Sequence, residues 1–144
     1  MSKLILAANR LPVTVEIKKS GEAAFSPSVG GLATGMSSVS KTHPCLWTGY
    51  SGIPADSIDQ AKSENIRDVL VGKYGAHPVP LTVRDIERYY NGFSNKTIWP
   101  LFHDLQSAEF DPQYWQAYTN VNRKFGEALL ALCQRHHGQR PADE

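Results

Sequence analysis

The sequence lacks the marks of a secreted, membrane or disulfide-built protein. Only two cysteines are present, Cys45 and Cys133, and they lie far apart with no CxxC spacing. They predict reduced thiols and not a disulfide framework. No apolar run approaches the ~18 residues of a membrane span, and residues 4–8 are too few for the core of a signal peptide. We therefore expect a cytoplasmic protein.

The sequence also has no large excess of positive or negative charge. Lys and Arg number 15 against 14 Asp and Glu, which leaves a formal net charge of +1 and no basic stripe. This balance argues against nucleic acid as a partner. The five histidines show no HExxH spacing, and no Ser-His-Asp arrangement stands out. The sequence predicts no metal site and no cofactor, and it assigns no catalytic acid, base or nucleophile.

What is present fits one globular domain. Hydrophobic residues make up 41% of the 144 positions and charged residues 20%, which are ordinary values for such a domain. A chain of this length can bury roughly 68% of the surface that it exposes when unfolded. A sizeable hydrophobic core is therefore expected.

The first third of the chain has the patterns of β-strands. Residues 4–8 form a continuous apolar run, typical of a strand buried on both faces of a parallel sheet. Residues 13–17 alternate between apolar and polar, which predicts a strand with one wet face. A turn at 20–22 allows residues 23–26 to return as its hairpin partner. Residues 45–50 predict a second central strand.

Helical patterns follow or alternate with these strands. A helix is predicted over residues 31–41, and residues 55–71 are weakly patterned, which favours one short helix followed by a strand. Thr82 is expected to cap a helix that ends at residue 90. Residues 112–134 show the clearest helical spacing. Strand, crossover helix and strand together predict an α/β fold with a mainly parallel sheet, whose carboxyl edge would bind ligand.

Residues 89–103, YYNGFSNKTIWPLFH, form an aromatic block with almost no charge. The Asn91-Gly92 dipeptide is typical of a turn, and Pro100 disfavours a plain helix, so the block predicts an aromatic loop. Rings with an apolar face and a polar tip, beside amides that donate and accept hydrogen bonds, suit a sugar-binding wall. The alternative is a loop packed as core.

Four segments in a fixed order carry a family resemblance. They are the first strand with its Asn-Arg pair (SKLILAANRLPV), the Gly-Gly helix start (SVGGLATGM), the tryptophan-containing strand (LWTGYSG) and the aromatic block. Each motif is weak alone, but together they are specific. From residue 3 to residue 132 the chain resembles glycosyltransferase family 20, the trehalose-6-phosphate synthases.

The resemblance implies a fold and a reaction. The fold would be a Rossmann-like, mainly parallel sheet, equivalent to the N-terminal (acceptor) lobe of a GT-B glycosyltransferase but incomplete. Residues 1–144 would form one partial lobe, with no second, donor-binding lobe. The parent reaction would transfer glucose from UDP-glucose to glucose 6-phosphate with retention of anomeric configuration. It would proceed without a demonstrated carboxylate nucleophile and rely on donor phosphate oxygens and positioned positive charge.

The resemblance also assigns an acceptor pocket for glucose 6-phosphate. Arg10 and Tyr90 would hold this acceptor, while Trp47 and Trp99 would shape the wall of its pocket. A guanidinium can hold a phosphate by two parallel hydrogen bonds. Without the resemblance, Arg10 would more simply be a surface arginine paired to a carboxylate. The neighbouring Asn9 is expected to fix the loop and not to touch ligand.

Three other aromatic or histidine positions have structural alternatives. Tyr89, next to Tyr90, is interpreted as a possible packing residue. Trp115 lies beside the apolar stripe of the last helix, so it is interpreted as core or partner surface. His103, at the end of the aromatic block, is interpreted as a structural hydrogen-bonding residue, with a supporting role near the site as the alternative.

For the donor, the resemblance assigns Gly30 and Gly31. Absent Cβ atoms let a diphosphate approach the backbone, and free N–H groups at a helix start favour anions. On residues alone this pair is equally a helix cap, because no P-loop or GxGxxG pattern surrounds it.

The resemblance covers only about the first third of a family member. The His-Asp-Tyr-His segment of the next strand and the cationic donor clamp of the second lobe are not in the sequence, so the chain alone is predicted to be inactive. Two alternatives stay open: a non-catalytic sugar-phosphate-binding or regulatory subunit, and the start of a bifunctional synthase/phosphatase. A homo-oligomer is a further possibility.

Overall fold

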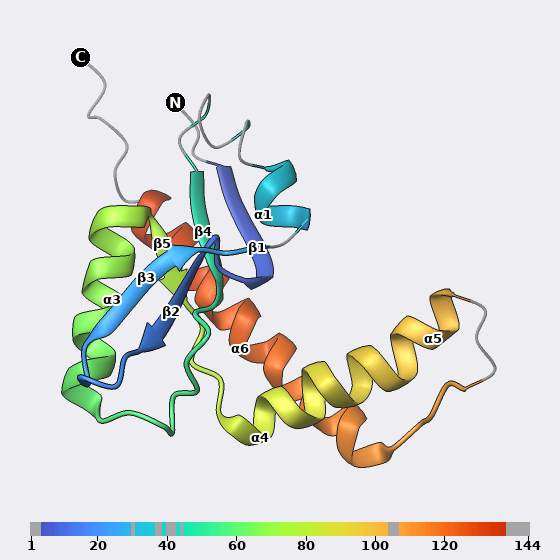
Figure 1. The fold of residues 1–144 in the computed structure, drawn as a ribbon. Helices are drawn as coiled ribbons and strands as arrows, with labels where there is room; N and C mark the ends of the chain where they lie inside the picture. Colours follow the sequence, from blue (N-terminus) through green and yellow to red (C-terminus); the bar gives the residue numbers. More distant parts are fainter. Residues whose placement is uncertain are drawn as a thin grey trace.

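The fold is described from a computed structural model, which covers residues 4–29, 31–36, 39, 43, 45–103 and 107–137 (Figure 1). A small parallel sheet and an antiparallel hairpin make up the body of the molecule. Two long helical segments leave this body and run side by side as an arm, as Figure 1 shows in yellow and orange.

The sheet has three strands in the order β1–β4–β5, and both neighbouring pairs are parallel. The strands are β1 (Leu4–Arg10), β4 (Cys45–Tyr50) and β5 (Ala76–Pro78). The central position of β4 was predicted from its sequence and is confirmed, because its last four residues are buried. The predicted α/β class with a mainly parallel sheet is confirmed as well.

The prediction that residues 4–8 are buried on both faces was wrong. No residue of β1 falls in the buried class, and Leu4 is exposed. The physical reason is position: β1 pairs only with β4, so its other edge is open in the described part of the chain. At the opposite edge, Pro78 in β5 removes a backbone donor that an added strand would need.

The predicted hairpin is confirmed. Strand β2 (Val13–Ile17) pairs antiparallel with β3 (Ala23–Pro27), in a register that places Val15 opposite Phe25. Gly21 makes the turn with φ of 84°, a conformation that glycine adopts without steric cost. Val13 and Val15 are buried, as the alternating pattern requires.

Residues 55–71 do not contain the expected short helix and strand. After a loop, one helix, α3 (Gln60–Tyr74), runs 15 residues and buries only Ile66 and Leu70, so its amphipathic pattern is faint. The residues at the two ends of α3 indicate the helix more clearly than its hydrophobic pattern does. The side chain of Asp59 accepts from the Lys62 amide at the start, and Gly75 ends the helix with φ of 60°. The earlier helix α1 spans Gly31–Gly35, and most of the predicted remainder to residue 41 lies outside the described residues.

The aromatic block is helical, so its prediction as a loop was wrong. Thr82 does cap α4 (Val83–Asp85), but the chain then continues as a wide π-helix, η1 (Ile86–Ile98), and as α5 (Trp99–Phe102). The predicted end at residue 90 is therefore passed. Pro100 lies in the first turn of α5, and the carbonyl oxygen of Lys96, four residues before it, accepts instead from the Glu109 amide at 2.8 Å.

Gly92 is in this helix for packing and not for a turn. A Cβ atom at Gly92 would lie 2.9 Å from the ring of Tyr114, so only glycine lets the two segments of the arm approach this closely. Tyr114 belongs to α6 (Pro112–His137), whose predicted span is confirmed. Next to Gly92, the buried Phe93 contacts the rings of Trp115 and Tyr118 at centroid distances of 5.2 and 4.9 Å.

The hydrophobic core has two parts, on opposite faces of the sheet. Residues three apart on a strand point to opposite faces, and Trp47 belongs to one cluster while Tyr50 belongs to the other. The first cluster joins the sheet to the hairpin and α3. The second joins it to α6 and the start of the arm, through Val79, Leu81 and Val121. Among the described residues, no helix is long and apolar enough to cross a membrane.

Candidate functional site

The carboxyl ends of β1 and β4 meet in an irregular register that brings Arg10 opposite Tyr50. Ala7 pairs with Thr48, but the next pair is Arg10 with Tyr50, so two residues of β1 face the single Gly49. The amide of Leu11 then donates to the Tyr50 carbonyl oxygen at 2.9 Å, which fixes the chain after the irregularity. Ligands of open α/β sheets bind at this carboxyl edge.

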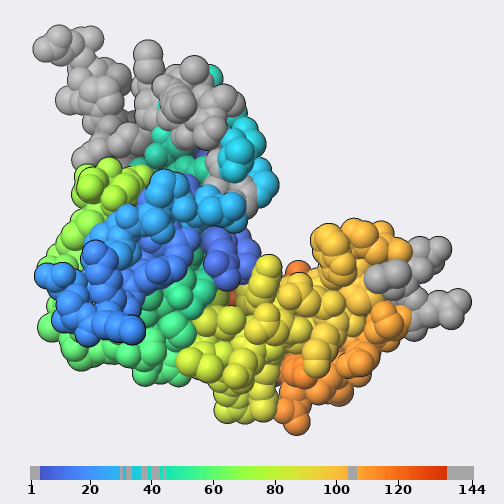
Figure 2. Space-filling view, in the orientation of Figure 1, coloured from blue at the N-terminus to red at the C-terminus, as the bar shows by residue number. Residues whose placement is uncertain are grey.

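Arg10 and Tyr50 line one small cleft together with residues from the start of the arm. The lining residues are Asn9, Arg10, Tyr50, Leu81, Ile86, Tyr89 and Tyr90. Three segments far apart in the sequence thus converge here. Arg10 is exposed, Tyr50 is buried, and Tyr90 keeps 37% of its surface exposed. In Figure 2 the surface is hollowed between the blue sheet body and the yellow and orange arm.

The two less exposed phenols of the cleft stay neutral at physiological pH. Burial raises the pKa of Tyr50, an effect that Arg10 opposes and Asp56 reinforces. Burial also raises the pKa of Tyr89, and the neighbouring Tyr118 and Tyr90 add to the rise. A neutral phenol can donate a hydrogen bond to an anion. One guanidinium beside phenol hydroxyls is therefore suited to a phosphate or a hydroxyl-rich ligand.

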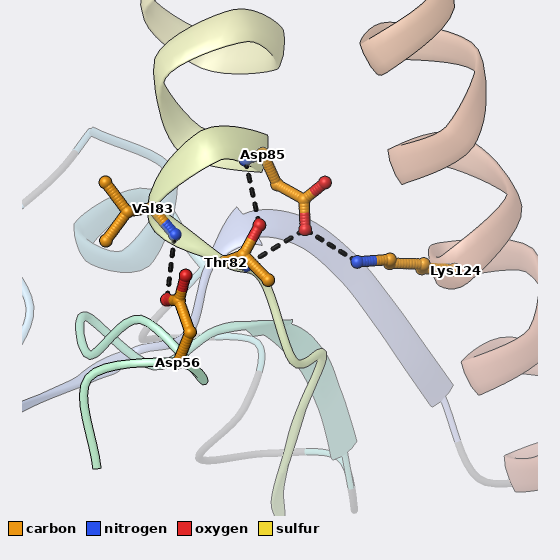
Figure 3. Close-up of polar contacts among 5 residues, drawn as sticks. All are labelled: Asp56, Thr82, Val83, Asp85 and Lys124. Atoms are coloured by element: carbon orange, nitrogen blue, oxygen red, sulfur yellow. Dashed lines mark hydrogen bonds and ion pairs between the residues drawn. The ribbon is translucent and has the colours of Figure 1, made fainter.

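The start of the arm is held in place by a polar cluster, the clamp of Asp56, Thr82, Val83, Asp85 and Lys124 (Figure 3). Asp85 and Thr82 form a reciprocal capping box: the Thr82 hydroxyl accepts from the Asp85 amide at 3.1 Å, and the Asp85 carboxylate accepts from the Thr82 amide at 2.9 Å. Lys124, on α6, donates to the same carboxylate at 2.6 Å. Asp56 accepts from the Val83 amide at 3.0 Å.

Burial alone would raise the pKa of Asp85, but the hydrogen bonds from Lys124 and Thr82 outweigh it, so its pKa lies below the ordinary value. Asp85 is therefore ionised near neutral pH and pairs with the Lys124 ammonium. The clamp thus holds the start of the arm to the sheet body through Asp56 and to α6 through Lys124.

The structure brings together only part of the predicted acceptor pocket. Arg10 and Tyr90 line the same cleft, as predicted. Trp47 does not line this cleft: it is only 4% exposed and packs in the core with Leu70 and Ala76, so its part in the acceptor pocket stays a prediction. The side chains of alternate strand residues point to opposite faces, and position 47 faces α3 and the hairpin.

Trp99 also lies outside the cleft. Its ring is 57% exposed on the arm and stacks on His103 at a centroid distance of 3.7 Å. His103 Nδ1 lies 2.8 Å from the Trp99 carbonyl oxygen, in keeping with its interpretation as a structural hydrogen-bonding residue. Contact between Trp99 and a bound sugar stays a prediction.

Sequence reasoning missed Tyr50. The same motif, LWTGYSG, contains both Trp47 and Tyr50, and only the strand register shows which ring reaches the cleft. Tyr89, interpreted as a packing residue, does pack against Tyr118 at 5.7 Å between ring centroids, and it also lines the cleft.

Of the predicted donor-binding pair, Gly30 lies outside the described residues. Gly31 begins α1 and is exposed. Within the described part of the chain, a Cβ atom at Gly31 would meet nothing within 4 Å, so packing does not require glycine there. Its role toward the donor stays a prediction. No group of three or more His, Cys, Asp or Glu side chains that could hold a metal ion occurs among the residues described.

Comparison with known proteins assigns the family. The family description of glycosyltransferase family 20 matches residues 2–138. The chain belongs to glycosyltransferase family 20. It is 40% identical over 142 residues to the bifunctional trehalose-6-phosphate synthase/phosphatase of Thermoproteus tenax, a match that covers 92% of this chain and 18% of that protein. It is 38% identical over 134 residues to the UDP-forming α,α-trehalose-phosphate synthase of Botryotinia fuckeliana, covering 92% of this chain and 25% of that one.

A solved structure agrees with this assignment. The UDP-forming α,α-trehalose-phosphate synthase of Burkholderia vietnamiensis is similar with a TM-score of 0.63 and 30% identity, over 92% of this chain and 26% of that chain. The predicted Rossmann-like arrangement of a GT-B transferase is thereby confirmed for the part that this chain covers. The family 20 chain spans about a fifth to a quarter of the length of the relatives that it matches.

Proposed function

We propose that this chain is the acceptor-side, amino-terminal part of an α,α-trehalose-6-phosphate synthase, which transfers glucose from UDP-glucose to glucose 6-phosphate. Family membership and the names of its relatives support the reaction. The structural observation that carries the acceptor role is the meeting of Arg10, Tyr50 and Tyr90 in one cleft at the carboxyl edge of the sheet.

In this function Arg10 holds the phosphate of glucose 6-phosphate. Its exposed guanidinium offers two parallel N–H groups, a geometry that matches phosphate oxygens and that lysine does not provide. The hydroxyls of Tyr50 and Tyr90 donate to the phosphate or to sugar hydroxyls. Each hydrogen bond to a charged group contributes about 1.5–3 kcal/mol. Trp47 and Trp99 remain predicted contacts, and neither lines the cleft.

The donor side is carried by Gly30 and Gly31, whose backbone N–H groups would face the diphosphate of UDP-glucose. A hydrogen bond from a neutral donor contributes about 0.5–1.5 kcal/mol net to binding. A few such bonds do not replace the positively charged side chains that stabilise a departing phosphate. We therefore expect no trehalose 6-phosphate from the isolated 144-residue chain. A phosphatase activity in a longer parent, as in the Thermoproteus tenax relative, stays an alternative. Reduced Cys45 and Cys133, both free of disulfides, support a cytoplasmic location.

A chimera tests the proposal directly. Residues 2–138 would replace the matching segment of the Burkholderia vietnamiensis synthase, and trehalose 6-phosphate would be measured with UDP-glucose and glucose 6-phosphate. We expect turnover, and we expect Arg10→Ala to raise the KM for glucose 6-phosphate at least about 10-fold, as loss of a bidentate charged contact implies.

Arg84→Ala is the matched control, because Arg84 is exposed on α4 and does not line the cleft. It should change KM by less than about twofold. A folded chimera that binds UDP but makes no product, or an Arg10→Ala chimera with unchanged kinetics, would contradict the proposal.

A further inference from the structure

Lys124 reaches across from α6 to the first turn of the arm. Its ammonium lies 2.6 Å from the Asp85 carboxylate, and the two side chains are 36% and 17% exposed. Asp85 is the last residue of α4, which continues without interruption into η1. Tyr89 and Tyr90 follow within the next five residues, and both line the cleft with Arg10. The Lys124–Asp85 pair is thus close to the phenols without being part of the cleft.

One carboxylate oxygen connects these elements. Oδ2 of Asp85 accepts both from the Thr82 amide, within the capping box, and from Lys124. The capping box ties the Asp85 side chain to the Thr82 amide at the first turn of the helix. Lys124 donates to the same oxygen. A shift of α6 would therefore move Asp85 and change the direction of the helix that carries Tyr90.

A second tether holds the other side of the helix start. Asp56 accepts from the Val83 amide, and the Ala55 amide donates to the Leu81 carbonyl oxygen at 2.8 Å. These contacts come from the loop that follows β4, the strand that ends at Tyr50. The helix start is therefore held between the sheet body and α6 by these polar tethers, which add to the ring contacts of Tyr89 and Phe93 with α6.

The Lys124–Asp85 ion pair contributes more to the placement of the α4–η1 helix than to the free energy of folding. Ion pairs with this much exposure typically contribute only about 0–1 kcal/mol to folding. The placement of a binding group is more sensitive, since a displacement of about 1 Å can change rates by roughly 100-fold. Tyr90 follows Asp85 by five residues, which is about one turn of the π-helix η1. A small tilt at Asp85 therefore moves its ring.

We propose that Lys124 is a positioning residue for acceptor binding: through Asp85 it fixes the direction of the α4–η1 helix and so the place of Tyr90 in the cleft that Arg10 also lines. This inference rests on the proposed function for the role of Tyr90, but the placement itself is measurable without substrate.

The test uses the 144-residue chain with 3-fluorotyrosine at position 90 and fluorine NMR as the readout of the ring. Lys124→Met removes the charge and keeps the length of the side chain. We expect it to shift or broaden the Tyr90 signal beyond the natural line width, while the midpoint of thermal unfolding changes little. Lys124→Arg should restore the original signal. Arg123→Met, at the exposed neighbouring position on α6, is the matched control and should leave the signal unchanged.

Asp85→Asn gives a second route to the same answer. If Lys124 acts through Asp85, this variant shifts the signal in the same direction, and the double variant adds nothing further. An unchanged Tyr90 signal in Lys124→Met, or fully additive shifts in the double variant, would overturn the inference.

Titration with glucose 6-phosphate separates this inference from the proposed function. If the unsubstituted 144-residue chain binds glucose 6-phosphate, Lys124→Met should weaken this binding several-fold and Lys124→Arg should not. A glucose 6-phosphate concentration of about 10 mM detects even millimolar affinity. If it leaves the Tyr90 signal of the unsubstituted 144-residue chain unchanged, that result contradicts the acceptor role only. The signal shift in Lys124→Met would still support the positioning role.

Discussion

Gly49 and Ala8 lie in such close contact that a Cβ atom on Gly49 would be 2.5 Å from the Ala8 carbonyl oxygen. The same atom would be 3.0 Å from the carbonyl carbon of Arg10. Glycine in the central strand thus makes room for the extra residue of β1. The irregular register that turns Arg10 toward Tyr50 depends on that room.

Gly49→Ala should therefore damage the site as well as the fold. The methyl group must displace backbone and not a flexible side chain, which costs about 1–3 kcal/mol of unfolding free energy. On the proposed acceptor role, displacing Arg10 should also weaken glucose 6-phosphate binding. Urea unfolding and calorimetric titration of the chain check the two effects. Gly72→Ala is the control: its Cβ has no neighbour within 4 Å in the described chain, and a helix interior favours alanine by about 1 kcal/mol.

Gly92→Ala should loosen the arm. The new Cβ would lie 2.9 Å from the Tyr114 ring and 3.2 Å from the Glu87 carbonyl oxygen, so η1 and α6 must separate. We expect a loss of about 1–3 kcal/mol in unfolding free energy. Gly126→Ala on α6, where a Cβ has open space among the described atoms, should be neutral or stabilising. Near-UV circular dichroism would report the loosened aromatic packing, and an unchanged spectrum and stability would refute the close contact.

The stability of the chain should depend on Asp85 in acid. Its pKa in the folded state lies below the ordinary value of 3.8, so the stabilisation is fully present above that value and is lost as pH falls through the folded pKa. At pH 7, Asp85→Asn should cost about 1 kcal/mol through the weakened capping box and ion pair. Urea unfolding of both proteins between pH 7 and pH 2 checks this. The difference between them should shrink below pH 3.8, and a difference that stays constant would show that the carboxylate charge is irrelevant.

Two tryptophans should differ sharply in their effect on stability. Trp47→Ala removes a buried ring from the first core and should cost about 3–5 kcal/mol, with Trp47→Phe as a milder variant that keeps the fold. Trp99→Ala removes an exposed ring and should change unfolding free energy by about 0.5 kcal/mol or less. Thermal unfolding followed by circular dichroism distinguishes them. Equal losses would mean that Trp47 is not a core residue.

Much of the fold followed from local patterns. The alternation in residues 13–17, the apolar run of β4 and the spacing of α6 are each set by neighbours along the chain, so the sequence predicted them correctly. The two helices that the sequence did not predict share one cause. In α3 only Ile66 and Leu70 are buried, and in η1 the Asn91-Gly92 dipeptide imitates a turn. Both helices are stabilised by partners elsewhere in the chain, which no local pattern contains.

The sequence by itself determined the family and the α/β class, because motif order and strand patterns are properties of the chain. Only the tertiary structure decided which aromatic rings could reach a ligand. Trp47 and Tyr50 stand three residues apart on one strand and so face opposite sides of the sheet, one into the core and one into the cleft. The Lys124–Asp85 contact joins residues 39 apart, and it exists only because α6 packs beside the helix that Asp85 begins.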